Sequence, residues 1–291
     1  NHRFFNEVII DGDKVTKRCI DSKYEDVHSK EKLWYSAVSD RLENIPKIYS
    51  YDPLTMGRIG GEHLWNFKEN KEELINNFCD ALDSLHGIVE VDANTDDMID
   101  VYLKKTKSRV KEVRSLIRDI DEPMVKINSR MCINPLCDDE YFEEHIKKIS
   151  NIDKFNIIHG DNTFSNTIAD ENSKIWFIDP RGVFGSTPIY GDRRYDYAKL
   201  YYSAYGNYDS INSKDYRIKL DRRNVNLEIK SNGYEEFADL IIKRSGVPKA
   251  EIQLIHACIW FALTGYVKED YDAVLFAFYK GCQLWTEAVS D

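Results

Sequence analysis

Three oxygen-bearing side chains stand in the stretch from Ile157 to Gly182, and their types suit phosphate chemistry. Asp161, Asn166 and Asp179 follow one another among apolar runs. Carboxylate and amide oxygens are ligands that Mg²⁺ accepts, and this ion shares its remaining positions with water and substrate phosphates. A further carboxylate close by can orient or deprotonate a hydroxyl group. The set is therefore typical of a site that transfers a phosphoryl group.

A simpler reading applies to each of these residues alone. Asp and Asn are common in turns because their side chains accept hydrogen bonds from nearby backbone N–H groups. That reading does not account for the whole pattern, in which H-G-D-x-x-x-x-N precedes a hydrophobic strand and the pair Ile178-Asp179. The combination favours a functional site.

The residues between Asn166 and Asp179 predict a β-hairpin. The segments "NTIAD" and "KIWFID" alternate in polarity on either side of the turn "ENSK". Asn166 stands at the start of the first strand and Asp179 at the end of the second, and a hairpin brings these two ends together. Asp161 lies on the loop that enters the hairpin. We expect the three side chains to converge at one edge.

The chain before this stretch predicts a small β-rich part with one helix, followed by a helical part. Residues 6–20 indicate a hairpin around Asp11-Gly12-Asp13, residues 29–42 a helix with Ser29 as its N-cap, and residues 45–61 two short strands. Apolar spacing then predicts helices over 70–88, 96–117, 138–151, 195–206, 234–246, 250–265 and 272–285, with a surface hairpin over 217–232. We expect two domains, 1–60 and 61–291.

The bulk composition excludes several classes of protein. A net charge of −10 argues against general nucleic-acid binding, which depends on a basic surface. No apolar run reaches the length that a membrane span needs. The six cysteines form no CxxC pair, so they read as free thiols of a reducing compartment, and we expect a cytoplasmic protein.

The segments "HGDNTFSN" and "FIDPRG" resemble the aminoglycoside phosphotransferase and choline kinase family. The resemblance extends over nearly the whole chain. It implies an α+β, bilobal protein-kinase-like fold, with residues 1–60 as the nucleotide-binding lobe and 61–291 carrying the catalytic loop and the acceptor site. It also implies ATP or another nucleoside triphosphate and Mg²⁺ as cofactors, Asp161 as the catalytic base, and Asn166 and Asp179 as the metal ligands. His159 would be a structural hydrogen-bonding residue.

The same resemblance implies a nucleotide site in the first lobe. A strand lysine should reach the α- and β-phosphates, and Lys17 fits this position better than Lys14, which lies too close to the turn. Glu31 on the following helix would pair with this lysine, with Glu25 as the alternative. No complete first strand precedes these elements in the sequence, so we expect that strand to lie further upstream or to be absent, and its absence would weaken nucleotide binding.

Two further segments resemble parts of the family pattern. "TMGRIGG" is similar to its hinge, which implies that backbone groups of Met56, Arg58 and Ile59 meet the adenine. "YGDRRYDYAKL" is similar to its G-D-P-x-x-D-x-A segment. This similarity implies that Asp192 and Asp196 brace the catalytic loop.

The phosphate acceptor is expected to be a small molecule with a hydroxyl group. Arg181, Arg193 and Arg194 follow Asp179, and arginine suits carboxylate or phosphate recognition. They favour a sugar, a sugar acid or a phosphorylated acceptor, unless they pair with Asp192, Asp196 or nearby glutamates.

Residues 178–206 also resemble kinase-like domains found beside sugar nucleotidyltransferases in bacterial surface-polysaccharide pathways, which suggests fusion to an upstream domain. One alternative is a choline, ethanolamine or aminoglycoside kinase, which would show an acidic pocket opposite Asp161. The other is a nucleotide-binding pseudokinase or regulatory module. The complete set of Asp161, Asn166, Asp179 and Lys17 argues against the latter.

Overall fold

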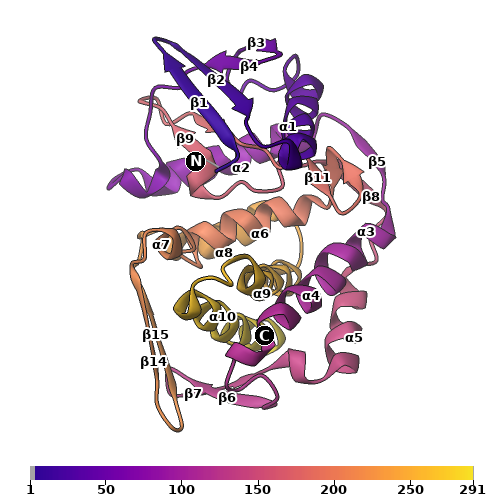
Figure 1. The fold of residues 1–291 in the computed structure, drawn as a ribbon, viewed down its shortest axis with the longest axis vertical. Helices are drawn as coiled ribbons and strands as arrows, with labels where there is room; N and C mark the ends of the chain where they lie inside the picture. The colour runs from indigo at the N-terminus through magenta and orange to yellow at the C-terminus, as the bar shows by residue number, and fades with distance from the viewer. Residues whose placement is uncertain (1–3, 291) are drawn as a thin grey trace. The chain divides into compact units, whose positions relative to one another are not determined.

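The structure is a computed structural model that describes residues 4–290. The chain forms two compact units (Figure 1). The first unit contains Asn1–Ala93 and Lys154–Leu200, and the second contains Asn94–Asp153 and Tyr201–Asp291. The boundary after Leu200 falls inside helix α6 (Arg193–Ala204). The expected lobe boundary near residue 60 stays a prediction.

The first unit begins with a four-stranded antiparallel sheet in the order β1-β2-β4-β3 (Figure 1). The sequence-predicted hairpin over residues 6–20 and the two short strands after it are confirmed as β1 (Asn6–Asp11), β2 (Lys14–Cys19), β3 (Ile48–Tyr51) and β4 (Leu54–Gly57). Strand β2 is central, and Lys17 pairs with Val8 on one side and with Leu54 on the other. This central place directs the Lys17 side chain into the unit, where it is buried.

Helix α1 (Glu25–Val38) begins earlier than the sequence predicted. Ser29 lies inside this helix and is not its N-cap. A short 3₁₀ turn (Ser22–Tyr24) leads into the helix, and the Asp21 side chain accepts a hydrogen bond from the Lys23 N–H there. Because the turn is capped in this way, the helix starts at Glu25, four residues before Ser29. Glu31 and Trp34 are among the residues that the helix buries.

The rest of the first unit contains short strands around helix α2 (Lys71–His86). Strand β8 (Lys154–Ile157) lies between β13 (Tyr190–Gly191) and β5 (Glu90–Asp92). Two small hairpins follow β8, one of β9 (Thr167–Ala169) with β10 (Ile175–Phe177) and one of β11 (Val183–Phe184) with β12 (Thr187–Pro188). Strand β8 and the β9–β10 hairpin carry the predicted catalytic segment.

The second unit is mostly helical and contains one further sheet. Its helices are α3 (Thr95–Ile99), a π-helical turn (Asp100–Lys104), α4 (Lys105–Val113), α5 (Asp139–Ile149), α7 (Asp209–Asn212), α8 (Ala238–Ser245), α9 (Lys249–Tyr266) and α10 (Tyr271–Ser290). No helix within residues 4–290 combines the length and the hydropathy that crossing a bilayer requires. The long helices α9 and α10 pack together and supply much of the unit's core (Figure 1).

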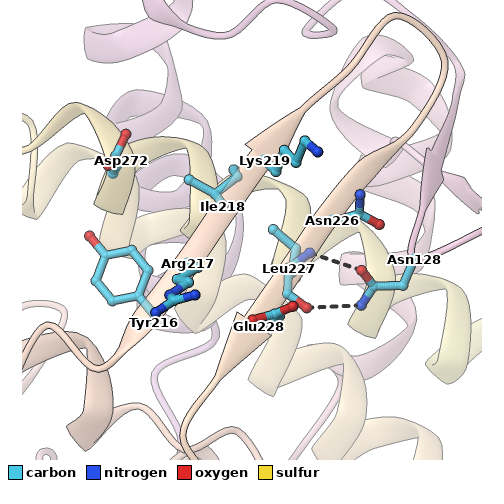
Figure 2. A pocket seen from close by; sticks show the side chains of 9 residues that line it. All are labelled: Asn128, Tyr216, Arg217, Ile218, Lys219, Asn226, Leu227, Glu228 and Asp272. Carbon is cyan, nitrogen blue, oxygen red and sulfur yellow. Dashed lines mark hydrogen bonds between the residues drawn. The ribbon is translucent and has the colours of Figure 1, made fainter.

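The sheet of the second unit has the order β14-β15-β6-β7. Its strands are β6 (Met124–Ile127), β7 (Arg130–Ile133), β14 (Tyr216–Leu220) and β15 (Val225–Ile229), so the predicted hairpin over 217–232 is confirmed. The parallel join of β15 to β6 is short, and the Asn128 side chain extends it (Figure 2). Its amide accepts from the Leu227 N–H at 2.8 Å and donates to the Leu227 carbonyl at 3.2 Å.

A buried histidine in α9 makes the second unit sensitive to acid. The Trp260 indole N–H donates to Nε2 of His256 at 2.9 Å, so this nitrogen is unprotonated. Burial, with a smaller contribution from the charge of Lys280, holds the pKa of His256 well below its ordinary value. In the unfolded chain the same ring takes up a proton near pH 6.5. The stability that it contributes is therefore present above that pH and lost below it.

We expect the free energy of unfolding to fall between pH 7.5 and pH 5.0, with His256 contributing about 2 kcal/mol of the loss. A His256→Gln variant keeps an acceptor for Trp260 but cannot take up the proton. Urea unfolding at the two pH values measures the difference. Equal acid losses in the variant and in the natural chain would contradict the assignment to His256.

Candidate active site

The β9–β10 hairpin places Asn166 beside the residues that lead to Asp179. Thr167 pairs with Phe177 in the hairpin register, and the Ile178 N–H donates to the Asn166 carbonyl at 3.0 Å. Asn166 directly precedes β9, and Asp179 directly follows Ile178. The hairpin expected from the alternation of "NTIAD" and "KIWFID" is confirmed.

The turn after Asp179 is tight and lies against helix α1. Asp179 itself has a φ of 52°, in the left-handed region that most residues avoid. Gly182 has a φ of 71°, and a Cβ there would lie 2.6 Å from the Lys30 carbonyl of α1. On the same helix, the Trp34 indole N–H donates to the Ile158 carbonyl at 2.7 Å. The helix that carries Glu31 is thus held against both ends of the catalytic segment.

Asp161 and Asn166 are joined directly. The Asn166 side-chain amide donates to the Asp161 carbonyl at 2.7 Å and to Oδ2 of the Asp161 carboxylate at 3.0 Å. Because Nδ2 faces Asp161, the Oδ1 of the same amide points away from it. Asn166 is buried, while about a third of the Asp161 side chain (31%) remains exposed. The carboxylate of Asp161 can therefore be reached from solvent.

Lys17 lies between two buried carboxylates. Its Nζ is 2.6 Å from Oε1 of Glu31, and it also donates to Oδ1 of Asp179. Burial alone would lower the pKa of Lys17, but the charges of Glu31 and Asp179 outweigh burial and hold the pKa above its ordinary value. The ammonium is therefore charged at neutral pH. Of the two glutamates considered from the sequence, Glu31 is the partner.

Asp196 on α6 holds the backbone of the catalytic loop. Its carboxylate accepts from the N–H groups of His159 and Gly160, each at 2.9 Å, and lies 2.8 Å from the His86 ring. The Asn162 amide donates to the Asp196 carbonyl at 2.9 Å. The bracing role expected for Asp196 agrees with these contacts.

His159 is structural, as the sequence predicted. Its Nε2 donates to the Ile178 carbonyl at 2.8 Å, and its Nδ1 accepts from the Asp161 N–H at 3.1 Å. Both ring nitrogens are therefore used in holding the loop to the hairpin. Complete burial lowers the pKa of His159, so the ring is neutral at pH 7.

The segment expected to meet a nucleotide base follows β4. Met56 lies within the sheet, between Val15 of β2 and Ile48 of β3, and its side chain is buried. The Arg58 N–H donates to the Asp13 carbonyl at 2.7 Å, and its side chain is exposed. Within residues 4–290, no backbone–backbone hydrogen bond involves Ile59. The expected contact of these three residues with a base stays a prediction.

Gly61 lies where the segment after β4 meets the β9–β10 hairpin. Glu62 and Ala169 form an isolated antiparallel bridge, with N–H to carbonyl distances of 3.0 and 2.9 Å. A Cβ at Gly61 would lie 2.4 Å from the Ala169 carbonyl, so only glycine permits this approach. The segment that follows β4 and the β9–β10 hairpin are therefore held together by this bridge.

The three arginines expected at the acceptor differ in their surroundings. Arg181 is exposed and Arg193 is half-buried. Arg194 is buried, and its guanidinium pairs with the carboxylate of Asp192 at 2.7 to 3.0 Å. This pairing agrees with the alternative given for the arginines, and the acceptor role of Arg194 stays a prediction. Asp192 also accepts from the Arg194 N–H at the start of α6, and its expected bracing of the catalytic loop stays a prediction.

Sequence analysis missed one charged neighbour of Asp161. Lys199 on α6 places its Nζ 3.3 Å from Oδ1 of Asp161. The only signal in the sequence was its position three residues after Asp196, on the same helical face.

The pair Asn166 and Asp179 fits a hard cation. Across residues 4–290, no group of three or more His, Cys, Asp or Glu side chains gathers into a metal-binding cluster. An amide oxygen and a carboxylate are two hard ligands, and Mg²⁺ is commonly held by one or two carboxylates together with substrate phosphates and water. The donor set therefore fits Mg²⁺ better than Zn²⁺, which takes His and Cys.

A hollow of about 590 Å³ lies elsewhere, on the β14–β15 hairpin of the second unit (Figure 2). Its lining mixes both signs of charge: Arg217, Lys219, Glu228 and Asp272. None of the sequence-predicted site residues lines it. We therefore place the candidate active site at Asp161, Asn166, Asp179 and Lys17, whose side chains suit phosphate chemistry, and not at this hollow.

Comparison with known proteins finds matches among solved structures. No protein-family model and no curated protein sequence matches this chain. The solved gentamicin complex of APH(2″)-IIa aligns with 96% of this chain and 90% of its own at 15% identity, with a TM-score of 0.54. Choline kinase LicA from Streptococcus pneumoniae aligns with 100% and 90% at 12% identity, with a TM-score of 0.50.

The streptomycin–ATP complex of APH(2″)-IIa also aligns, over 97% of this chain and 92% of its own, at 16% identity and a TM-score of 0.50. These similarities extend over almost all of the chain, from the β-rich N-terminal sheet to the helical C-terminal part. The chain therefore has the α+β, protein-kinase-like fold of aminoglycoside phosphotransferases and choline kinases.

Proposed function

We propose that this protein is an ATP- and Mg²⁺-dependent phosphotransferase that acts on a hydroxyl group of a small molecule. The observation that carries the proposal is a pair of hydrogen-bonded side-chain groups in the first unit, which the hydrogen bond from the Ile178 N–H to the Asn166 carbonyl holds together. Asn166 bonds to the partly exposed carboxylate of Asp161, and Lys17 connects Glu31 to Asp179. Such a set contains the groups that phosphoryl transfer needs, namely a base, metal ligands and a phosphate-binding cation.

The reaction would proceed by in-line displacement. The acceptor oxygen forms a bond to the γ-phosphorus while the bond from that phosphorus to the β–γ bridging oxygen breaks, and its electron pair leaves with ADP. The acceptor's proton passes to the carboxylate of Asp161, which is accessible for this purpose. Lys17 would bind the α- and β-phosphates, and the backbone near Ile59 would bind the adenine.

Mg²⁺, when bound, would neutralise charge on the nucleotide phosphates. The Asn166 amide oxygen and the Asp179 carboxylate are the residues suited to hold it. The carboxylate of Asp179 accepts from Lys17 in the structure. Lys17 would therefore exchange this carboxylate for nucleotide phosphates upon binding.

The proposed acceptor is a sugar or sugar derivative of surface-polysaccharide biosynthesis. Exposed Arg181, two residues after Asp179, supports an acceptor that carries a carboxylate or phosphate group. The link to polysaccharides rests on the sequence resemblance alone. An amine-bearing acceptor is the second candidate, since the structural relatives include a gentamicin complex and a choline kinase.

A screen of ADP release over candidate acceptors tests the proposal. Sugars, sugar acids, sugar phosphates, choline, ethanolamine and aminoglycosides are each incubated with ATP and Mg²⁺, and the product is weighed by mass spectrometry. We expect a phosphorylated sugar-type product, with turnover lost on addition of EDTA and restored by Mg²⁺. Turnover only with amines would favour the second candidate. ATP binding without any phosphorylated product would favour a regulatory module.

A further inference from the structure

Both oxygens of the Asp161 carboxylate have a protein partner. Oδ2 accepts from the Asn166 amide at 3.0 Å, and Oδ1 lies 3.3 Å from Nζ of Lys199. The two partners come from different elements, because Asn166 precedes β9 and Lys199 lies on α6. Two contacts on opposite oxygens restrict the rotation of a carboxylate. A carboxylate has about four lone-pair sites, so two contacts leave it able to accept another hydrogen bond.

The position of Lys199 follows from the way α6 is held. Asp196, on the same face and one turn earlier, bonds to the N–H groups of His159 and Gly160 and to the His86 ring. These contacts fix the helix against the loop without any help from Lys199. The Lys199 side chain is 13% exposed, and its Nζ lies 5.6 Å from the centre of the Tyr195 ring. Its stem is therefore packed while its charge reaches Asp161.

The contact between Lys199 and Asp161 is not needed to dock the helix. Asp196 already supplies that attachment, and an ion pair that remains partly open to solvent contributes little to stability. The pair instead orients the one carboxylate of the catalytic loop that solvent can reach. A small displacement of a catalytic carboxylate slows the reaction strongly, although it changes the free energy of unfolding little.

We propose that Lys199 is a positioning residue, which together with Asn166 holds the Asp161 carboxylate in the orientation that accepts the acceptor's proton. The inference rests on the proposed function. In the transfer step the proton moves from the acceptor hydroxyl to Asp161 as the new O–P bond forms and the bond to the bridging oxygen of ADP breaks. Lys199 keeps its own protons throughout.

Two substitutions test this role. Lys199→Met keeps the length of the side chain and removes its charge and donors, and Lys199→Arg keeps a charge and donors. With the acceptor found in the screen, we expect K199M to lower kcat by about 10- to 100-fold, because the base is misoriented. The KM for ATP should stay within about twofold. K199R should recover part of kcat, and the urea midpoint of K199M should equal that of the natural chain.

A double-mutant cycle shows whether Lys199 acts through Asp161. In an Asp161→Asn background there is no carboxylate to position, so adding K199M should cost less than about threefold in the single-turnover rate. Lys154→Met is the matched control, since Lys154 makes an exposed ion pair with Asp92 at 2.7 Å in the same unit. It should leave kcat unchanged.

Several results would overturn the inference. A normal kcat in K199M would do so, as would an equal cost of K199M with and without the Asp161 carboxylate. A large fall in the urea midpoint of K199M would show that Lys199 stabilises the fold and does not only position Asp161. If the natural chain turns over and D161N is slowed as expected, any of these results refutes the role of Lys199 alone. A natural chain without turnover on any acceptor refutes the proposed function as well.

Discussion

Replacing Asp161 with asparagine should lower turnover by about 10²- to 10⁴-fold while nucleotide affinity stays nearly unchanged. Asparagine has the same shape and still offers one oxygen to the Asn166 amide, but it cannot take up the acceptor's proton. The groups expected to bind the nucleotide, Lys17 and the backbone near Ile59, keep their surroundings. The measurements are ADP release at saturating acceptor and a fluorescence titration with ATP and Mg²⁺.

The matched control for this change is Asp92→Asn. Asp92 is an exposed carboxylate of the same unit that pairs with Lys154, so its replacement also removes one negative charge. We expect its turnover to stay within about twofold of the natural chain. Turnover that survives in D161N would show that another group takes the proton. A parallel loss of ATP affinity would indicate a wider disturbance of the loop.

Replacing Lys17 with methionine should destabilise the ligand-free protein by about 3–5 kcal/mol. The ammonium separates two buried carboxylates, Glu31 and Asp179, and lies within reach of both. Without it these two charges would remain in a poorly solvated site and repel each other. ATP affinity should fall as well, since a phosphate-binding cation is lost. Urea unfolding and nucleotide titration measure the two effects.

Lys14→Met provides the control on the same strand. Lys14 lies on β2 and is exposed, with its Nζ 4.7 Å from the centre of the Tyr49 ring. An exposed cation–π contact contributes about 0.5–1 kcal/mol, so the loss of stability should be no larger than that. Equal losses from K14M and K17M would mean that the buried carboxylates find another way to be neutralised. Lys17 would then not be the cation on which the two buried carboxylates depend.

Sequence patterns predicted the parts of the site that are local in the chain. Asp161, Asn166 and Asp179 are connected by one loop and one hairpin, and alternation of polarity identifies a hairpin without knowledge of the rest of the fold. The pairing of Lys17 with Glu31 came from the resemblance, and the distance of 2.6 Å agrees with it. The fold class was likewise within reach, because the motif is specific and the resemblance extends over the chain.

Contacts between residues far apart in the chain, and the shortest strands, could not be predicted from the sequence. The strands β5, β8 and β13 pair across distant parts of the chain and are too short to show a period. Lys199 meets Asp161 only because Asp196 holds α6 against the loop. The choice between the two surroundings expected for Arg194 could not be made from the sequence, because a charged residue gives no sign of whether a neighbour, here Asp192, pairs with it.

The close approach of Gly61 to Ala169 limits how the chain could be re-engineered. A redesign that aims to change the proposed base site would enlarge or reshape residues after β4, yet any side chain at 61 would meet the Ala169 carbonyl and push the β9–β10 hairpin away. Libraries for altered base selection should therefore vary Ile59 and keep glycine at 61. Under the proposed function, a side chain at that position would alter the base site and the position of the β9–β10 hairpin together.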